Sequence, residues 1–273
     1  MDVGRTRTDA VIPQIFRGLC DDAALFPPGN APIDAAVPGH LAYRDSAFAD
    51  LVGPFVFPIP RLAELKSIPA PLSLSLTAPG GPGTVEAGLA AARAIPGVTV
   101  VAVEVTMPTG TDISMLRTVD RDVDIYVEIP RDERRAAVFD AVDERGYRAK
   151  FRTGGVTADL YPEVAELAHA IGEATRREIP FKATAGLHHA IRNTDPARGF
   201  EQHGYLNVLL AAQAAHSGAR KTELESILEI RDPGVIARLV GGIEAERVFL
   251  SFGTCSIHEP LADLMSLGLI PPT

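Results

Sequence analysis

Two lysines near the ends of apolar runs are the residues of this chain best suited to covalent chemistry. Lys150 precedes Gly154 and Gly155, and Lys182 precedes Gly186 at similarly short range. An ammonium on a buried strand needs a partner, because desolvating it alone costs several kcal/mol. Burial and a second nearby cation both favour the neutral, nucleophilic amine. The pair therefore predicts a Schiff-base site, and the simpler alternative is that both lysines are solvated strand ends paired with acids.

Eight short apolar runs, which alternate with amphipathic stretches, must position these lysines. Most runs are rich in Val, Ile, Leu or Phe and bounded by Pro or Gly, as buried parallel strands are. We expect strands at 23–26, 54–57, 72–77, 98–106, 123–129, 148–152, 181–184 and 247–251. We expect helices at 84–95, 132–144, 161–177, 206–215 and 260–267. This alternation predicts one α/β domain over residues 1–273, a (β/α)8 TIM barrel. A doubly wound open sheet is the alternative, and the weak first strand is where it would enter.

The segment at about 187–246, before the last strand, is longer than an ordinary connection of about 2–6 residues. Beyond the helix at 206–215 it contains helical patterns at 221–228 and 233–239. We therefore expect a helical insertion, which either covers the barrel mouth or forms the interface of a homo-oligomer.

Polar side chains gather at the predicted carboxyl ends of the strands, where barrels of this kind build their active sites. The period of two along a strand places Lys150 and Arg152 on one side of their strand. Glu104 and Glu128 should converge on the same mouth, which would set an amine beside proton-transferring carboxylates. The other polar residues at these ends are Asn30, Arg61, Thr77, Thr106, Lys182, Thr184, His188, His189, Ser251 and Thr254.

The chain from about 98 to 257 resembles deoxyribose-phosphate aldolase and its class I aldolase relatives. Lys150-Phe151-Arg152-Thr153-Gly154 is similar to the Lys-x-x-Thr-Gly that carries that family's Schiff-base lysine. Phe181-Lys182-Ala183-Thr184-Ala185-Gly186 is similar to the Phe-Lys-x-x-x-Gly of its following strand. Phe252-Gly253-Thr254-Cys255-Ser256 resembles its phosphate-binding Gly-Thr-Ser-Ser turn, and Val127-Glu128 falls where the family has Ile-Glu-Thr.

The resemblance implies a lyase that needs no cofactor and acts on a small carbonyl compound. Lys150 would form the imine, Lys182 would keep it partly unprotonated, Glu104 would relay protons and Glu128 would support the lysines. The residues that would bind a substrate phosphate or carboxylate are Arg152, Thr153, Gly154, Gly186, His188, His189, Ser251, Gly253 and Thr254.

Several positions depart from the family's pattern and favour a different substrate. Glu104 is longer than the family's aspartate, and Arg152 replaces a small residue. Ala185-Gly186-Leu187-His188-His189 replaces a Gly-Gly-Val-Arg, and the long insertion is foreign. Because a fold does not determine an activity, two alternatives stay open. One is a phosphoribosyl-transfer type of enzyme without an imine, which binds a phosphorylated or carboxylate ligand in a cationic pocket. The other is a non-catalytic binding or scaffold barrel.

A metal centre and a reactive thiol are both weaker interpretations. Adjacent side chains such as His188 and His189 point to opposite sides of an extended segment and do not easily share one ion. We expect no bound metal, and we expect one of the two histidines to face the barrel mouth. Cys255 lies in a glycine-rich turn, where a small buried residue is the expected role.

Composition excludes several classes of partner. A net charge of −9 argues against nucleic acid. No apolar stretch reaches the ~20 residues that span a bilayer. The N-terminal Met1–Arg7 lacks the hydrophobic segment of a signal peptide, and two cysteines make no disulfide framework. We therefore expect a cytoplasmic protein that acts on a small molecule.

Overall fold

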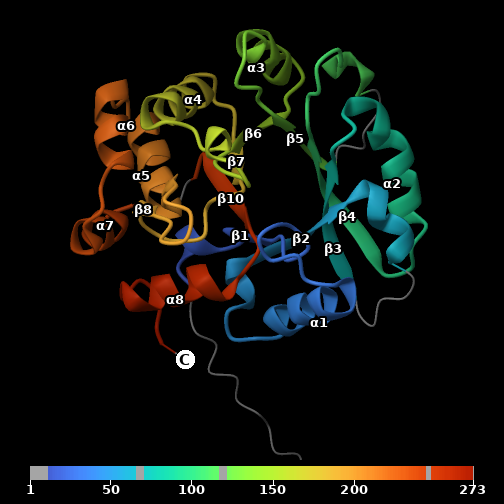
Figure 1. The fold of residues 1–273 in the computed structure, drawn as a ribbon, viewed down its shortest axis with the longest axis horizontal. Coiled ribbons are helices and arrows are strands. Elements are labelled where there is room, and N and C mark those ends of the chain that lie inside the picture. Colours follow the sequence, from blue (N-terminus) through green and yellow to red (C-terminus); the bar gives the residue numbers. More distant parts are fainter. Residues whose placement is uncertain (1–11, 66–70, 117–121, 244–246, 273) are drawn as a thin grey trace, which may run out of the picture.

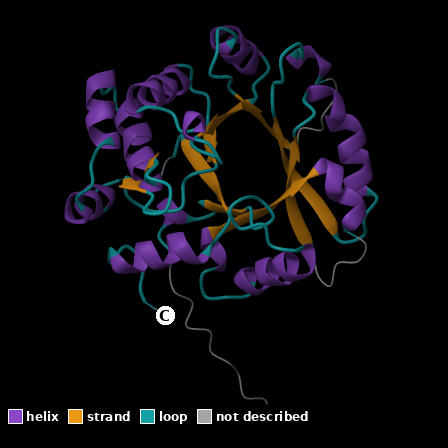
Figure 2. Ribbon diagram, viewed as in Figure 1, coloured by secondary structure: helices purple, strands orange, loops and turns teal. Residues whose placement is uncertain are grey.

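Eight parallel strands close into a barrel in the computed structural model, which describes residues 12–65, 71–116, 122–243 and 247–272 (Figures 1 and 2). The strands follow the order β1-β10-β7-β6-β5-β4-β3-β2 around the barrel. Their bounds are Cys20–Asp22 (β1), Val52–Pro58 (β2), Leu72–Ala78 (β3), Val98–Val105 (β4), Asp124–Glu128 (β5), Arg148–Arg152 (β6), Phe181–Thr184 (β7) and Phe249–Thr254 (β10). The predicted (β/α)8 barrel is confirmed. The open sheet is wrong, because β1 pairs with both β2 and β10.

The first and last strands differ most from the prediction. The first strand is Cys20–Asp22, and the predicted 23–26 is a turn in which Phe26 N–H donates to Ala23 O at 2.9 Å. This turn precedes Pro27-Pro28, where two consecutive residues lack the N–H that a ladder needs. The last strand begins two residues later than predicted and continues to Thr254. The segments 1–11 and 244–246 lie outside the described residues. The expectation about a signal peptide concerns Met1–Arg7 and therefore lies outside them too.

Helices surround the barrel, and their bounds are Ile33–Arg44 (α1), Val85–Arg93 (α2), Arg135–Glu144 (α3), Val164–Arg176 (α4), Tyr205–His216 (α5), Lys221–Leu228 (α6), Pro233–Val240 (α7) and His258–Ser266 (α8). α1 was not expected, because Pro38 lies inside it and interrupts the helical pattern. Two contacts hold α1 to the barrel: His40 Nδ1 lies 3.1 Å from Asp22 Oδ2, and Arg44 Nη1 donates to Val52 O at 2.7 Å.

The long connection before β10 is helical, as predicted, and also contains a hairpin of Asn193–Thr194 (β8) and Glu201–Gln202 (β9). α5 takes the place of a barrel helix, with α6 and α7 on its outer side (Figure 1). Its Asn207 donates to Ile227 O and Ile230 O, both at 2.9 Å, which ties α5 to the end of α6. The added helices therefore extend the outer layer of the barrel.

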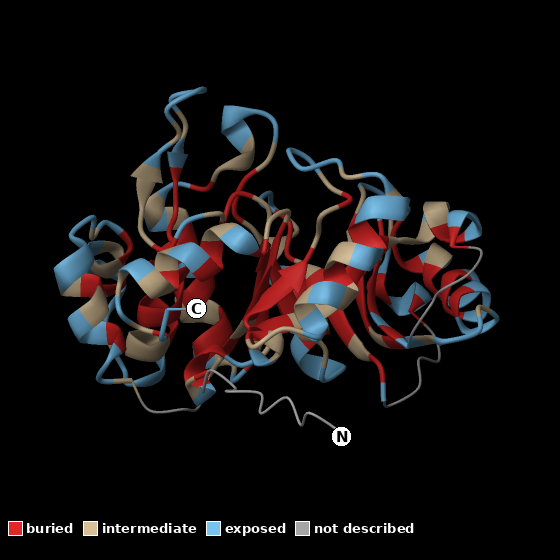
Figure 3. Cartoon of the chain, turned by 90° about the horizontal axis from the view of Figure 1, so that it is seen from below, coloured by how far each residue is buried: buried red, intermediate tan, exposed pale blue. Residues whose placement is uncertain are grey.

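Aromatic side chains alternate with the lysines along the strands and decide which side faces inward. Phe151 contacts Phe181, and Phe181 contacts Phe249, with ring centroids 4.8 and 5.3 Å apart. These three residues belong to the buried core, and buried residues are red in Figure 3. Because side chains alternate along a strand, Lys150 and Lys182 point to the opposite side, into the barrel. Among the described helices, none is long and apolar enough to cross a membrane.

Candidate functional site

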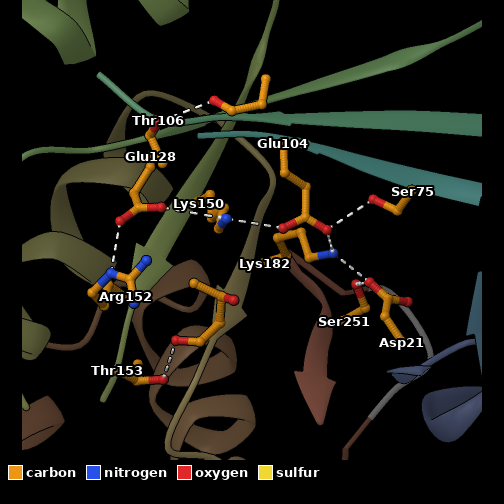
Figure 4. Close-up of polar contacts among 12 residues, drawn as sticks. Asp21, Ser75, Glu104, Thr106, Glu128, Lys150, Arg152, Thr153, Lys182 and Ser251 are labelled. Carbon is orange, nitrogen blue, oxygen red and sulfur yellow. Dashed lines mark hydrogen bonds and ion pairs between the residues drawn. The ribbon is translucent and has the colours of Figure 1, made fainter. Parts of the chain in front are cut away.

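Six charged side chains form one cluster inside the barrel (Figure 4). Three carboxylates face three cations, so the cluster carries no net charge when all six are ionised. Strand pairing produces this arrangement, because Glu128, Lys150 and Lys182 are register partners across β5, β6 and β7. The members are Asp21 from β1, Glu104 from β4, Glu128 from β5, Lys150 and Arg152 from β6, and Lys182 from β7.

Lys182 is held between two carboxylates at the back of the cluster. Its Nζ donates to Asp21 Oδ2 at 2.5 Å and to Glu104 Oε1 at 2.6 Å, and the side chain is 1% exposed. Burial favours the neutral amine, but the charges of Asp21 and Glu104 outweigh it and raise the pKa of Lys182. The cation that was predicted to keep Lys150 unprotonated is therefore itself neutralised by two acids.

Glu104 bridges the two lysines. Its Oε1 accepts from Lys182 and from the Ser75 hydroxyl at 2.8 Å, and its Oε2 lies 3.0 Å from Lys150 Nζ. Burial opposes ionisation, but the charges and hydrogen bonds of the two lysines lower the pKa of Glu104 to about 2. Glu104 is thus a fixed carboxylate that contacts the two lysines through different oxygens.

Glu128 connects Lys150 to Arg152. Its Oε1 accepts from Arg152 Nε at 2.8 Å, and its Oε2 lies 3.3 Å from Lys150 Nζ. Burial opposes ionisation here too, but the charges of Lys150 and Arg152 lower the pKa of Glu128. Oε2 is buried and accepts no hydrogen bond within the described part of the chain. Glu128 therefore offers Lys150 an acceptor oxygen with no competing donor.

Asp21 is the member of the cluster that was not predicted. Its Oδ2 accepts from Lys182 and from the Ser251 hydroxyl at 2.9 Å. Burial raises the pKa of Asp21, although the Lys182 charge opposes the change. Ser251 contacts Asp21, which in turn holds Lys182, and the predicted contact of Ser251 with substrate stays a prediction.

A cavity of about 200 Å³ opens over one side of the cluster. Glu104, Lys150 and Arg152 line it, and Lys182 and Asp21 do not. Its other walls come from Ala23, Phe26, Pro27, Val56, Thr77, Pro79, Thr106, Thr184, Ala185, His188, Gly253 and Cys255. Of the two lysines, Lys150 is the one that a ligand can reach.

The loop after β6, predicted to bind phosphate, is closed on itself. The Thr153 hydroxyl donates to Ala185 O at 2.5 Å and lies 3.2 Å from Thr184 O. Gly154 and Gly186 pack backbone to backbone, so a Cβ on Gly186 would lie 2.9 Å from Gly154 Cα. These three residues fix the approach of the β6 and β7 loops and do not line the cavity, and their role as substrate contacts stays a prediction.

The polar groups at the end of β10 are also engaged within the protein. The Thr254 hydroxyl donates to Ser256 O at 3.0 Å, and Thr254 is buried. The first turn of α8 contains an acid, Glu259, whose Oε2 lies 3.2 Å from His188 Nδ1. A carboxylate already lies where the sequence predicted an anion, and of the residues expected there only Gly253 lines the cavity.

The two adjacent histidines separate as predicted. His188 lines the cavity, and His189 faces away, with Nδ1 3.3 Å from Asp263 Oδ2. Cys255 Sγ lies 3.7 Å from His188 Nδ1, and burial raises the pKa of this thiol. Cys255 is therefore a wall of the cavity and a poor nucleophile.

Lysine usage is a signal in the sequence that would have strengthened the prediction. The chain has 26 lysines and arginines together, and only four are lysines: Lys66, Lys150, Lys182 and Lys221. A chain that uses arginine at nearly every cationic position has lysine at two inward positions of neighbouring strands. Lysine and arginine are not interchangeable, because only lysine yields a neutral amine near physiological pH when buried.

Comparison with known proteins gives no match for this chain. No protein-family model matches the chain, and neither a curated protein nor a solved structure matches it. The resemblance to class I aldolases therefore rests on the residues quoted above.

Proposed function

We propose that the chain is an enzyme in which Lys150 forms an imine with a small carbonyl compound. The observation that carries the proposal is the difference between the two lysines. Lys182 is enclosed by Asp21 and Glu104, whereas Lys150 lies at the floor of a cavity between Glu104 and Glu128. A buried amine that meets open space beside two carboxylates has the parts that carbonyl addition requires.

The proton steps follow from the two carboxylates. Lys150 Nζ gives a proton to Glu128 Oε2, the acceptor oxygen without a hydrogen bond. The neutral amine then attacks the carbonyl carbon, and a proton shifts from nitrogen to oxygen to give a carbinolamine. The Glu128 carboxyl returns its proton to the departing hydroxyl, water leaves, and an iminium forms. The lowered pKa of Glu128 makes the first transfer uphill and favours the return step, because the carboxyl readily gives its proton up.

Charge balance supports the same product. The iminium keeps the positive charge of the ammonium that it replaces, so the three carboxylates still face three cations after the reaction. Lys182 and Glu104 hold the back of the cluster in place while Lys150 changes partners. This gives Lys182 a positioning role in the proposal.

A binding or scaffold barrel without catalysis is the second candidate, and one observation favours it. Both lysines are paired with acids, as in a cluster whose only task is to fill the barrel. The cavity beside Lys150 argues against a purely structural role, because a cluster that only fills the barrel needs no open space. A strongly cationic ligand pocket, as in phosphoribosyl transfer, is less well supported, since carboxylates balance the cations.

Reductive trapping tests the proposal. The purified protein is incubated with small aldehydes and ketones plus borohydride, and the adduct is located by mass spectrometry of peptides. We expect one adduct on Lys150, absent in Lys150→Arg, which retains the charge between Glu104 and Glu128. Lys221→Arg is the matched control, because Lys221 is a half-exposed lysine on α6 that pairs with Glu225. No adduct with any carbonyl compound, or adducts on Lys221 alone, would exclude imine chemistry and leave the binding candidate.

A further inference from the structure

Arg152 is the most exposed cation of the charge cluster, and it has hydrogen-bond donors left over. Its Nε donates to Glu128 Oε1, and among the described residues its two terminal nitrogens make no hydrogen bond. The side chain is 32% exposed and lines the same cavity as Lys150. A guanidinium with two free N–H groups on one edge matches the two oxygens of a carboxylate.

Glu128 fixes the separation between this guanidinium and the reactive amine. One of its oxygens meets Arg152 Nε at 2.8 Å, and the other meets Lys150 Nζ at 3.3 Å. Arg152 Nε and Lys150 Nζ are therefore bridged by a single carboxylate. A substrate that engages both must carry its acid group and its carbonyl carbon close together.

The surroundings favour a carboxylate over a phosphate. The hydroxyls of Thr153 and Thr254 are bonded to backbone carbonyls, and Glu259 occupies the first turn of α8. Because the cluster has no cation in excess, Glu104 and Glu128 would oppose a dianion more strongly than a monoanion. The cavity of about 200 Å³ is also smaller than the ~300–1,000 Å³ of sites for drug-sized ligands.

We infer that the site takes a short 2-oxo acid, with the carboxylate on the terminal nitrogens of Arg152 and the 2-oxo carbon presented to Lys150. This rests on the proposed imine chemistry of Lys150 and adds the substrate class. In a 2-oxo acid the acid carbon and the reactive carbon are directly bonded, which matches the short separation that Glu128 imposes. The apolar walls from Phe26 and Val56 then accept a short alkyl group.

Pyruvate and pyruvamide provide a matched pair of probes, because they share the ketone and differ in the charge on the neighbouring group. Borohydride trapping on Lys150 is measured against probe concentration in the wild-type protein. Dihydroxyacetone phosphate, a phosphorylated ketone, is the third probe. We expect half-maximal trapping by pyruvate at a concentration about tenfold or more below that of pyruvamide, as for one charge-assisted bidentate contact. The wild-type comparison needs no variant that must fold.

Two substitutions then assign the preference to Arg152. Arg152→Gln should remove the advantage of pyruvate over pyruvamide, and Arg152→Lys should retain part of it as a point charge. Equal trapping of pyruvate and pyruvamide, or tighter trapping of the phosphorylated ketone, overturns the substrate class while imine chemistry stands. No trapping by any carbonyl compound overturns both. A pyruvate preference that survives Arg152→Gln overturns the assignment to Arg152.

Discussion

Replacing Glu104 by glutamine removes one charge from the centre of the cluster without changing its shape. The wild-type carboxylate contacts Lys182 Nζ at 2.6 Å, Ser75 Oγ at 2.8 Å and Lys150 Nζ at 3.0 Å, and it is 1% exposed. In Glu104→Gln three cations, of which Lys150 and Lys182 are buried, face two carboxylates. Breaking a buried ion pair from one side typically costs about 3–5 kcal/mol of unfolding free energy. In a domain of this size this corresponds to a melting temperature lower by about 6–20 °C.

Reversible urea denaturation at pH 7 measures this loss, and Ser75→Ala is the matched control. That substitution removes one hydrogen bond to the same oxygen without changing the charge of the cluster, so it should cost about 1.5–3 kcal/mol. Glu104→Gln/Lys182→Met returns the cluster to two carboxylates and two cations, and should recover part of what the single variant loses.

The pH dependence of Glu104→Gln gives a second test of the same argument. A lysine that stays buried without its acid has a lowered pKa in the folded state, so the unfolded chain binds more protons. Stability of the variant relative to wild type should therefore rise with pH above neutrality. A loss no larger than that of Ser75→Ala, with no such recovery, would refute the idea that Glu104 balances the two lysines.

Two further predictions concern the loops around the site. Gly186→Ala should lower the urea midpoint more than Gly199→Ala. Both glycines have positive φ (+74° and +71°), which costs about 1–2 kcal/mol for alanine, but only at Gly186 would a Cβ meet a carbonyl oxygen, that of Thr153 at 2.7 Å. Equal losses in the two variants would contradict the clash. Burial lowers the pKa of His203 to about 4, and its Nε2 donates to Pro162 O at 2.8 Å. Since the unfolded imidazole titrates near 6.5, stability is present above that pH and is lost as pH falls toward 4, by up to about 3 kcal/mol. His203→Gln, which keeps a donor, should flatten the unfolding free energy between pH 7 and 4, and a profile as steep as that of wild type would contradict this role.

The strands that carry the lysines could be predicted to their residue bounds, because their apolar character and flanking Pro and Gly are local. β1 could not be predicted in the same way, since two of its three residues are acids. Asp21 belongs in a strand only because Lys182, 161 residues away, neutralises it. α1 escaped prediction for a local reason, the proline within it.

The predicted phosphate site shows the limit of local pattern. The quoted motifs place Thr153 and Gly186 on loops of the barrel mouth and Thr254 at the end of β10. A motif cannot say which partner a hydroxyl chooses, and here Thr153 and Thr254 bond to carbonyls of their own neighbourhood. Likewise the acid Glu259, separated from the motif by a few residues, changes the charge at the start of α8.

Stability alone is a weak explanation for a charge cluster inside a barrel. Replacing buried ion pairs by apolar side chains of similar volume is often neutral or stabilising. The outward positions of these strands are filled by apolar residues such as Phe151, Phe181 and Phe249, whereas the inward positions carry the charges. Three of the six charged residues, Glu104, Lys150 and Arg152, line the cavity, and Lys150 has a carboxylate oxygen without a donor beside it. Lys182 is enclosed by carboxylates, whereas Lys150 faces the cavity. A reactive amine requires this accessibility, and a charge cluster with a purely structural role does not.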